Sequence, residues 1–292
     1  MKTILFSCIW YPVGAGMYLS RAFEELGHKV IRFGPDAKGF LPWMPQTDFA
    51  KYANKPDIGL DYPNDRTYPL ESALEKSGEV DLVLQCDANF YLTGKSPVPN
   101  VSWMVDNHCV QYEENQKDCD ILFGCHSWGY GSTDSRFHWL PCAYSPKDHF
   151  QLPGEKIYDA AFIGVPYQHR VQLVQELSRH GKLAVGLGVL GEDYNSAYNQ
   201  ARVGICFSAN GDVPMRVFEN AAQGLMLLCD RQRDLDKLHL IDGAHYIGFN
   251  NVEDAGVKFK LLMEQPETVK QIAEQGKEVL APHTYLARAQ EI

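Results

Sequence analysis

The sequence predicts an α/β protein built from two domains, each a parallel sheet covered by helices. The opening run Thr3–Ile9 is short and apolar, as buried parallel strands are, and an amphipathic helix through Leu26 follows it. The same alternation of strand and helix starts again at Tyr158–Gly164, after a turn-rich linker. Because 292 residues suffice for two cores, we expect two Rossmann-like domains at 1–150 and 151–292.

The remaining elements follow from apolar runs and helical periodicity. In the first domain we expect strands at Lys29–Phe33, Val80–Cys86, Val101–Val105, Ile121–Cys125 and Phe137–Leu140, and a helix at Leu70–Lys76. In the second we expect strands at Leu183–Leu187, Val203–Phe207, Leu225–Cys229 and Tyr246–Phe249, and helices at Gln168–His180, Tyr194–Ala201, Val252–Met263, Pro266–Leu280 and Thr284–Ile292. Residues 34–69 show no periodicity. Their aromatics Trp43, Tyr52 and Tyr62 are candidates for a sugar platform, or for a lid that packs its own rings.

Composition and charge limit the classes of function. The hydrophobic share of 45% and the charged share of 22% are those of an ordinary globular protein, and no apolar run approaches the roughly twenty residues that span a bilayer. The net charge of −10, without a cluster of Lys and Arg, disfavours a nucleic-acid substrate. The N-terminus shows no cleavage-site pattern and the eight cysteines lie mostly in apolar runs. We therefore expect a cytoplasmic protein with buried free thiols.

The most informative stretch is 202–230, RVGICFSANGDVPMRVFENAAQGLMLLCD. It predicts a strand, a polar loop, a helix that opens at Pro214, and a second strand. Asp212 can cap this helix, whose first N–H groups and dipole favour an anion. Arg216 adds a positive charge in the first turn, and Glu219 can accept two hydroxyl protons at once, as a ribose offers them. The alternative is a plain strand–helix–strand unit in which Glu219 pairs with Arg216 on the surface.

This pattern resembles the donor-binding segment of GT-B glycosyltransferases, in particular the spore-maturation-type (CgeB-like) group. The signature of that group is an arginine, an aromatic, a glutamate and a small-residue helix ending in glycine, and Arg216, Phe218, Glu219 and Gly224 meet it. The resemblance implies the GT-B fold, in which two Rossmann-like domains face a cleft. It also implies that the glutamate holds the ribose of a nucleotide sugar.

The resemblance further implies which residues hold the donor. Many retaining members carry a second glutamate at the position of Gly211, so sugar contacts would fall here to its neighbours or to backbone. Family members often have an arginine soon after the first strand of the second domain, as Arg170 is here, and it would meet a phosphate unless it lies on the helix surface. The implied donor-binding residues are Gly164, Arg170, Gly188, Asn210, Gly211, Asp212, Pro214, Met215, Arg216 and Glu219.

In the first domain the resemblance points to two places. The glycine loop Gly14-Ala15-Gly16 would lie at the cleft, against the donor phosphates or the acceptor. A strand ends at Asp106-Asn107-His108, where the CgeB-like group often has two acids in succession. Asp106 or His108 is a candidate general base for the acceptor hydroxyl, and the alternative is that they hold a loop through hydrogen bonds. Arg216 is the candidate that stabilises the departing diphosphate.

Two further patterns resemble parts of cofactor-binding or metal-binding sites. The glycine loop also begins a G-x-G-x-x-G of the nicotinamide type, but Leu19 takes the third glycine position. A zinc site would draw on His108, Cys109, Cys119, Cys125, His126, His138 and Cys142. No C-x2-C or H-x3-H pair is present among these residues, and the sequence lacks a D-x-D motif. We therefore expect no cofactor and no metal, because helix N-termini and arginine can hold a diphosphate.

The function that follows is metal-independent transfer of a sugar, of the hexosyltransferase type, from a UDP-linked donor to an acceptor hydroxyl. The first domain would hold the acceptor, the second the donor, and the last helix would return to the first domain. The acceptor stays open among a surface glycan, a protein, a small molecule and a hydroxymethylated base in phage DNA. Three rival functions remain: a sugar-nucleotide epimerase of the same fold, a non-catalytic nucleotide-sugar or glycan-binding protein, and a nicotinamide oxidoreductase.

Overall fold

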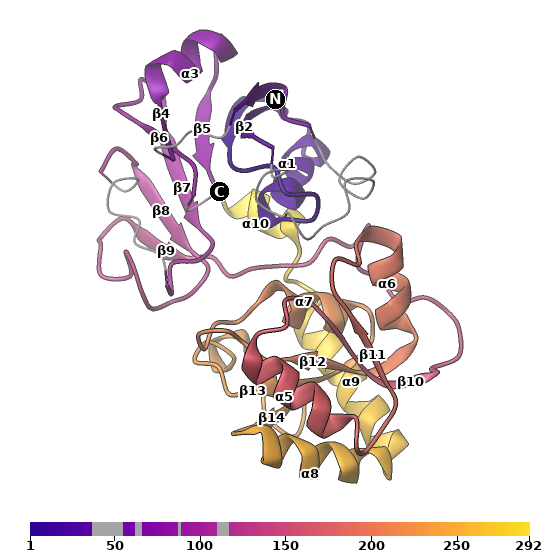
Figure 1. The fold of residues 1–292 in the computed structure, drawn as a ribbon. Coiled ribbons are helices and arrows are strands. Elements are labelled where there is room, and N and C mark those ends of the chain that lie inside the picture. Colours follow the sequence, from indigo (N-terminus) through magenta and orange to yellow (C-terminus); the bar gives the residue numbers. More distant parts are fainter. Residues whose placement is uncertain (37–54, 62–65, 87–88, 110–116) are drawn as a thin grey trace. The chain divides into compact units, whose positions relative to one another are not determined.

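A computed structural model describes residues 1–36, 55–61, 66–86, 89–109 and 117–292. The chain forms two compact units (Figure 1): unit 1 comprises Met1–Cys142 and Tyr285–Ile292, and unit 2 comprises Ala143–Thr284. Each unit is a parallel sheet with helices packed against it, so the predicted fold of two Rossmann-like domains is confirmed. The aromatics expected to form a platform or lid, Trp43, Tyr52 and Tyr62, lie outside the described residues.

Unit 1 is organised around a seven-stranded parallel sheet in the order β3-β2-β1-β5-β7-β8-β9. Its strands are β1 (Thr3–Ser7), β2 (Lys29–Pro35), β3 (Ile58–Leu60), β5 (Leu82–Gln85), β7 (Asn100–Met104), β8 (Ile121–Gly124) and β9 (Phe137–Trp139). Strand order runs outward from β1 in both directions, which makes the β1–β5 pair a topological switch point. Ligands in such sheets bind beyond the carboxyl ends of the strands at that point.

The helices of unit 1 come from both ends of the chain. They are α1 (Ala15–Glu25), α3 (Leu70–Ser77) and α10 (Tyr285–Glu291), and a small parallel pair joins β4 (Thr67–Pro69) to β6 (Tyr91–Thr93). The C-terminal helix α10 lies beside α1 (Figure 1), with the rings of Tyr18 and Tyr285 5.2 Å apart. Arg288 secures it by donating from Nε to the carbonyl of Pro141 at 2.7 Å. The last helix therefore belongs to the unit that contains the N-terminus.

Unit 2 repeats the architecture with five parallel strands in the order β11-β10-β12-β13-β14. Its strands are β10 (Tyr158–Ile163), β11 (Leu183–Gly186), β12 (Ala201–Cys206), β13 (Met226–Asp230) and β14 (Ile247–Phe249). Its helices are α5 (Gln168–Leu177), α6 (Gly191–Asn199), α7 (Met215–Ala222), the short η2 (Asp236–Leu238), α8 (Val252–Met263) and α9 (Pro266–Leu280). The switch point of this sheet lies between β10 and β12.

Strand alternation in unit 2 assigns the helices to two layers. Ala160 and Phe162 of β10 belong to a core with residues of α5, α8 and α9. Ala161 and Ile163, one position along, belong to a second core with Tyr198 of α6. Because successive side chains of a strand point to opposite faces, the sheet is covered on both sides, which explains why its strands read as continuous apolar runs.

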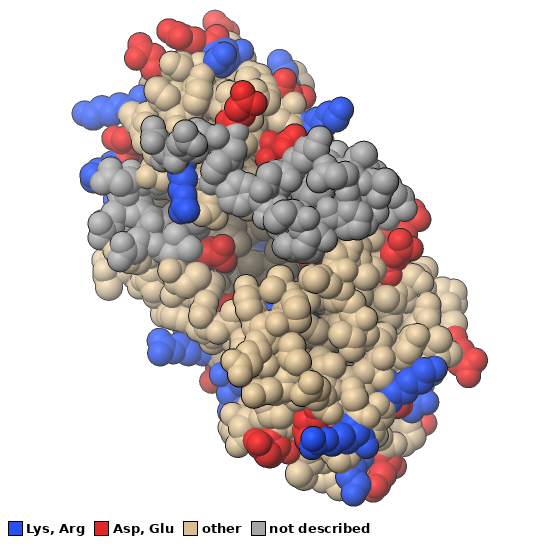
Figure 2. All heavy atoms as spheres, in the orientation of Figure 1, with Lys and Arg blue, Asp and Glu red and all other residues tan. Residues whose placement is uncertain are grey.

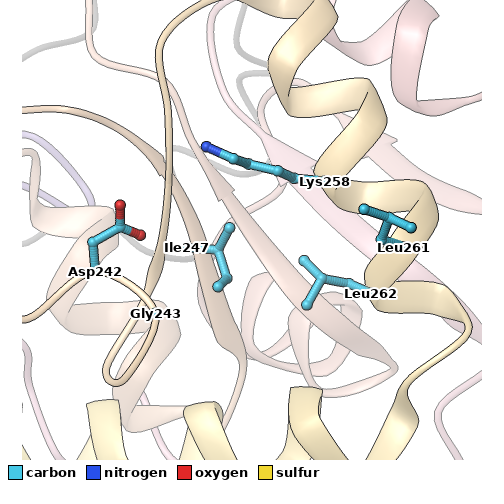
Figure 3. A pocket seen from close by; sticks show the side chains of 6 residues that line it. All are labelled: Asp242, Gly243, Ile247, Lys258, Leu261 and Leu262. Carbon is cyan, nitrogen blue, oxygen red and sulfur yellow. The ribbon is translucent and has the colours of Figure 1, made fainter.

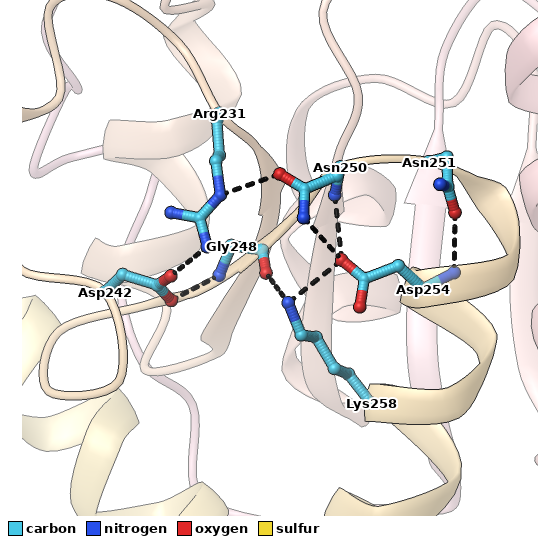
Figure 4. A network of polar contacts seen from close by, with 7 residues as sticks. All are labelled: Arg231, Asp242, Gly248, Asn250, Asn251, Asp254 and Lys258. Atoms are coloured by element: carbon cyan, nitrogen blue, oxygen red, sulfur yellow. Dashed lines mark hydrogen bonds and ion pairs between the residues drawn. The ribbon is translucent and has the colours of Figure 1, made fainter.

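A polar network holds the edge strand β14 to α8 (Figure 4). Asn251 is the N-cap of α8 and accepts from the N–H of Asp254 at 2.8 Å. Lys258 donates to Asp254 at 2.9 Å and to the carbonyl of Gly248 at 2.6 Å. The hydrogen bond from Lys258 and one from the backbone of Asn250 lower the pKa of Asp254. Such contacts cover an edge that would otherwise present unpaired backbone groups.

A hollow lies beside the same edge strand (Figure 3). It is lined by Asp242, Gly243, Ile247, Lys258, Leu261 and Leu262. None of these residues follows β10, β11 or β12, so the hollow is separate from the carboxyl ends at the switch point of unit 2.

The structure differs from the sequence expectations chiefly at element ends. Strands and helices end within a few residues of the predicted bounds, while the three-residue strands β3, β4 and β6 had not been predicted. The chain leaves unit 1 at Cys142, ahead of the boundary expected at 150. All eight cysteines are free and seven are buried, Cys109 being the exposed one. Within the described residues, no helix is both long and apolar enough to cross a membrane.

Candidate functional site

Two arginine side chains converge on the carboxyl end of β10 in unit 2. Arg216, in the first turn of α7, donates from Nη2 to the carbonyl of Ile163 at 2.6 Å. Arg170, in the first turn of α5, donates from Nε to the carbonyl of Phe207 at 2.7 Å and from Nη1 to that of Val165 at 3.3 Å. Both guanidinium groups therefore rest on backbone carbonyls at the ends of β10 and β12.

Neither of these guanidinium groups has an acidic partner in the described part of the chain, and Nε of Arg216 has no hydrogen-bond partner there. Both lie over the ring of Phe162, with the guanidinium carbons of Arg216 and Arg170 at 4.9 Å and 5.8 Å from its centroid. Arg170 is 8% exposed. Burial, and next the charge of Arg216, lower the pKa of Arg170. Neither guanidinium is in contact with a carboxylate in the described residues, so the pair is a candidate site for an anion.

Gly164 has a geometric reason to be glycine. A Cβ at this position would collide with Nη2 of Arg216. The absence of a side chain lets the guanidinium lie across the end of β10 and reach Ile163. The position of Arg216 therefore depends on a glycine at 164.

The loop between β12 and α7 is held by Asp230 at the end of the neighbouring strand. Ser208 donates from its backbone N–H to Oδ1 of Asp230 at 2.9 Å and from its hydroxyl to Oδ2 at 2.5 Å. The N–H of Gly211 in turn donates to the Ser208 hydroxyl at 3.0 Å. The loop that contains Asn210 and Asp212 is therefore fixed at its base before any ligand arrives.

The start of α7 differs from the sequence expectation. Pro214 is the N-cap and makes no side-chain capping bond. Asp212 instead accepts from the N–H of Asn210 at 3.3 Å. The prediction that Asp212 caps the helix is wrong: a proline disfavours the helical conformation in the residue before it, here Val213, and Pro214 itself has an extended ψ of 159°, so the helix starts at Met215.

Glu219 is buried, with 7% of its surface exposed. Its Oε2 accepts from the hydroxyl of Tyr194 at 2.6 Å, and its Oε1 lies 3.5 Å from Nε2 of His149. The alternative of a surface pair between Glu219 and Arg216 is wrong, since each has other partners. The role of Glu219 as a ribose ligand stays a prediction.

Gly188 lies two residues after the end of β11 with a positive φ of 70°, and Gly211 has a φ of 77° with open space where a Cβ would be. Both follow strands that flank β10, at the switch point of unit 2. The predicted donor-binding residues therefore come from the loops after β10, β11 and β12 and from α5 and α7.

A pocket at the switch point of unit 1 gathers the residues predicted there. Gly14, Ala15 and Gly16 line it after β1, Asn89 lines it after β5, and Asp106 lines it after β7. The structure thus brings the glycine loop and the candidate general base Asp106 to one place. Asp106 is exposed, and its role as a base stays a prediction.

Asn107 holds the loop that follows β8 rather than replacing a catalytic acid. It is 1% exposed, and its Nδ2 donates to the carbonyls of His126, Trp128 and Tyr130 at 2.9, 3.0 and 3.3 Å. Its Oδ1 accepts from the N–H of His126 at 2.9 Å. His108 follows it, with its ring centroid 4.5 Å from that of His126. An amide is required at position 107 because a carboxylate cannot donate to carbonyls.

The cysteines of the suggested zinc cluster make other contacts. The Sγ atoms of Cys125 and Cys142 are 3.5 Å apart, and burial raises the pKa of Cys125. Cys119 accepts from the side-chain amide of Gln85 at 3.7 Å, and burial raises its pKa to about 12. These thiols behave as core residues of unit 1.

Residues 145–292 match the model of the glycosyl transferase-like family, which is more than half of the chain. The chain belongs to the glycosyl transferase-like family. No curated protein matches the sequence. The family match covers nearly all of unit 2, the unit that contains Arg170, Arg216 and Glu219.

Several solved structures share the fold of this chain over nearly its whole length at low identity. HepE from Anabaena, solved with UDP and glucose, is 9% identical with a TM-score of 0.68, over 100% of this chain and 98% of that one. Sucrose-phosphate synthase from Thermosynechococcus elongatus is 12% identical with a TM-score of 0.65, over 99% and 96%. A candidate UDP-N-acetylglucosamine 2-epimerase from Listeria monocytogenes is 12% identical with a TM-score of 0.56, over 99% and 94%. These likenesses confirm the predicted GT-B fold.

Sequence reasoning missed several residues that shape the site. Tyr194, His149, Ser208 and Asp230 all contact predicted site residues or the loop that carries them. The sequence offered one faint signal, since Asp230 ends a predicted buried strand at the edge where ligands gather. Nothing in the sequence pairs Tyr194 or His149 with Glu219.

We predict that Asn107→Asp strongly destabilises the protein. The substitution replaces an amide whose two N–H groups are shared among three carbonyls with a buried carboxylate facing those carbonyls, which costs about 3 kcal/mol or more. Urea unfolding measures the change. The matched control is Asn251→Asp, which adds the same charge at an exposed N-cap that aspartate fills equally well, and should leave stability unchanged. Equal stability of the two variants would show that Asn107 has no such structural role.

Proposed function

We propose that the protein transfers a sugar from a UDP-linked donor to an acceptor hydroxyl, with unit 2 holding the donor. The observation that carries this proposal is the pair Arg170 and Arg216, held at the carboxyl end of β10 without an acidic partner in the described residues. Membership of the glycosyl transferase-like family supports the reaction class. HepE from Anabaena, a structure of the same fold, was solved with UDP and with UDP-glucose, which supports the donor.

The diphosphate is the part of such a donor that suits the arginine pair. A phosphate between the guanidinium groups relieves their mutual repulsion and offers charged oxygen acceptors to the remaining N–H groups. The first N–H groups of α7 lie on the same segment as Arg216 and favour the same charge. During transfer the charge on the departing diphosphate grows, and Arg216 stabilises it. No cation is needed in this mechanism.

The other parts of the donor then have assigned partners. Glu219 receives the ribose hydroxyls. The loop with Asn210, Gly211 and Asp212, fixed by Asp230, contacts the sugar. Gly188, after β11, borders the base. The sugar is a hexose in this proposal, and the CgeB-like subgroup is the branch of the family that the Arg216–Glu219 signature favours.

Unit 1 provides the acceptor side in this proposal. Asp106 takes the proton of the acceptor hydroxyl at the pocket formed with the glycine loop, and His108 is the second candidate for that role. Basic and acidic side chains are interspersed on the face drawn in Figure 2 rather than gathered into a basic surface. This distribution favours a glycan, protein or small-molecule acceptor over a nucleic acid. The free buried thiols support a cytoplasmic location.

An epimerase of the same fold is the second candidate function, because one of the structural neighbours bears such a name. An epimerase converts the donor alone and needs no acceptor. Incubating UDP-sugars without acceptor separates the two functions: isomerised donor supports the epimerase, and unchanged donor that releases UDP with an acceptor supports the transferase.

Arg170→Gln is expected to weaken UDP binding by about tenfold to a hundredfold, the loss of a charged hydrogen bond to phosphate. Titration calorimetry measures the affinity, and the thermal midpoint without ligand checks that the variant folds. The matched control is Arg179→Gln, which removes the same charge from an exposed residue just past α5, paired with Glu176. If Arg170→Gln folds and binds UDP as tightly as the wild type, the diphosphate site lies elsewhere.

UDP binding is expected to survive EDTA with its affinity unchanged within about threefold, because N–H groups and arginine neutralise the diphosphate. Parallel titrations with EDTA and with magnesium or manganese test this. Binding that is lost on chelation and returns with metal would overturn the metal-free mechanism.

Asp106→Asn is expected to lower the turnover number for transfer by about a hundredfold or more, the usual worth of a general base. UDP affinity should not change, since Asp106 lies on the acceptor unit. Steady-state rates with an acceptor found by screening, together with UDP titration, separate the two effects. A turnover number within about threefold of the wild type would show that Asp106 is not the base.

A further inference from the structure

Tyr194 makes the shorter of the two contacts to the Glu219 carboxylate in unit 2. Its hydroxyl donates to Oε2 at 2.6 Å, whereas Nε2 of His149 is 3.5 Å from Oε1. Tyr194 lies in the first turn of α6 and Glu219 in α7, so the contact joins two helices. A hydrogen bond of this length to a carboxylate is of the charge-assisted kind, which strongly fixes the orientation of the acceptor.

The tyrosine acts as a donor at all physiological pH values. Burial, and next the charge of Glu219, raise the pKa of Tyr194 well above its ordinary value. The hydroxyl therefore keeps its proton and points it at the carboxylate. Because the phenol ring has few rotatable bonds, the contact costs little conformational freedom.

The ring of Tyr194 is itself held in place. Its centroid lies 4.8 Å from that of Tyr198 and 6.0 Å from that of His149. Asn195 and Asn199, on the same helix, tie α6 to the segment that enters unit 2: Asn195 accepts from the N–H of Phe150 at 3.2 Å, and Asn199 donates to its carbonyl at 2.9 Å. The helix that carries Tyr194, the hydrogen-bond donor to Glu219, is therefore anchored to its surroundings.

A carboxylate offers about four lone-pair positions, of which the hydrogen bond from Tyr194 occupies one, while Nε2 of His149 lies 3.5 Å from the other oxygen. At least two positions remain, the number that a ribose diol needs. Because only 7% of the surface of Glu219 is exposed, its buried neighbours restrict how the carboxylate can turn. Its orientation then decides whether both ribose hydroxyls are met, and a side chain held by fixed neighbours gives that precision.

We propose that Tyr194 is a positioning residue that orients Glu219 for recognition of the donor ribose, with His149 as a second support. The inference rests on the proposed function, because a ribose is present only if unit 2 binds a nucleotide. A purely structural role, in which the contact only joins α6 to α7, makes a different prediction: its loss would change stability but not the preference for ribose.

The test compares the dissociation constants of UDP and 2′-deoxy-UDP, measured by titration calorimetry. The wild type should prefer UDP by about tenfold or more, as expected of a hydrogen bond to a charged group. In Tyr194→Phe, UDP should bind about threefold to tenfold more weakly while 2′-deoxy-UDP changes little, so that the preference falls. The matched control is Tyr198→Phe, which removes a buried hydroxyl one turn along the same helix that accepts from the N–H of Ile163, and should keep the wild-type preference.

A second variant keeps the test decisive if Tyr194→Phe folds poorly. Glu219→Gln retains the size of the side chain and should also lose the preference for ribose. Adding Tyr194→Phe to it should reduce the preference no further, since both act in one interaction.

The outcomes distinguish the positioning role of Tyr194 from the proposed function. If the wild type prefers ribose and Tyr194→Phe keeps that preference in full, the positioning role is wrong and the proposed function stands. If the wild type binds UDP without preferring ribose, the ribose assignment of Glu219 falls together with this inference, and the diphosphate site stands. If the wild type binds neither nucleotide, the proposed function fails and this inference fails with it.

Discussion

The arrangement at the carboxyl end of β10 depends on two positive charges that are stabilised by backbone rather than by acids. Arg216 crosses above Gly164 to reach Ile163, and Arg170 reaches the end of β12. A carbonyl satisfies a guanidinium N–H without cancelling its charge, so the pair stays available to an anion. Burial makes the same charges costly in the absence of one. A bound phosphate would offset this cost, as the proposed function requires.

In both units the candidate residues lie beyond the carboxyl ends of parallel strands. In each, candidate residues follow strands at or next to a switch point: β1 and β7 in unit 1, and β10, β11 and β12 in unit 2. Unit 1 presents a glycine loop and a carboxylate there, which suits the acceptor of the proposed reaction, since it must lose a proton. Unit 2 presents arginines and a helix start, which suits the proposed donor, since it must lose a diphosphate. The two proposed roles thus rest on charge at the strand ends and not on the shared fold.

The sequence predicted the elements well because parallel strands buried on both faces are continuous apolar runs, as in β12 and β13. It also placed Arg216 and Glu219 on one helix. The sequence could not predict which side chains contact each other when they are far apart along the chain. Tyr194 and Glu219 are 25 positions apart, and Asn107 is 19 to 23 positions from the carbonyls of His126 and Tyr130. The cap at Asp212 was predicted wrongly because Pro214 disfavours the helical conformation at Val213, the residue before it. Strand β3 was not predicted because it has three residues and lies in the stretch 34–69, which shows no periodicity.

In the proposed function, unit 2 recognises the diphosphate of a nucleotide through Arg170 and Arg216. The most direct measurement is the affinity of the wild-type protein for uridine, UMP and UDP, by titration calorimetry at fixed ionic strength. The account predicts that affinity rises with each phosphate, by about tenfold or more from UMP to UDP, because the second phosphate brings further charge-assisted hydrogen bonds. Equal affinity for uridine and UDP would contradict the account, since binding would then depend on the nucleoside and not on the anion.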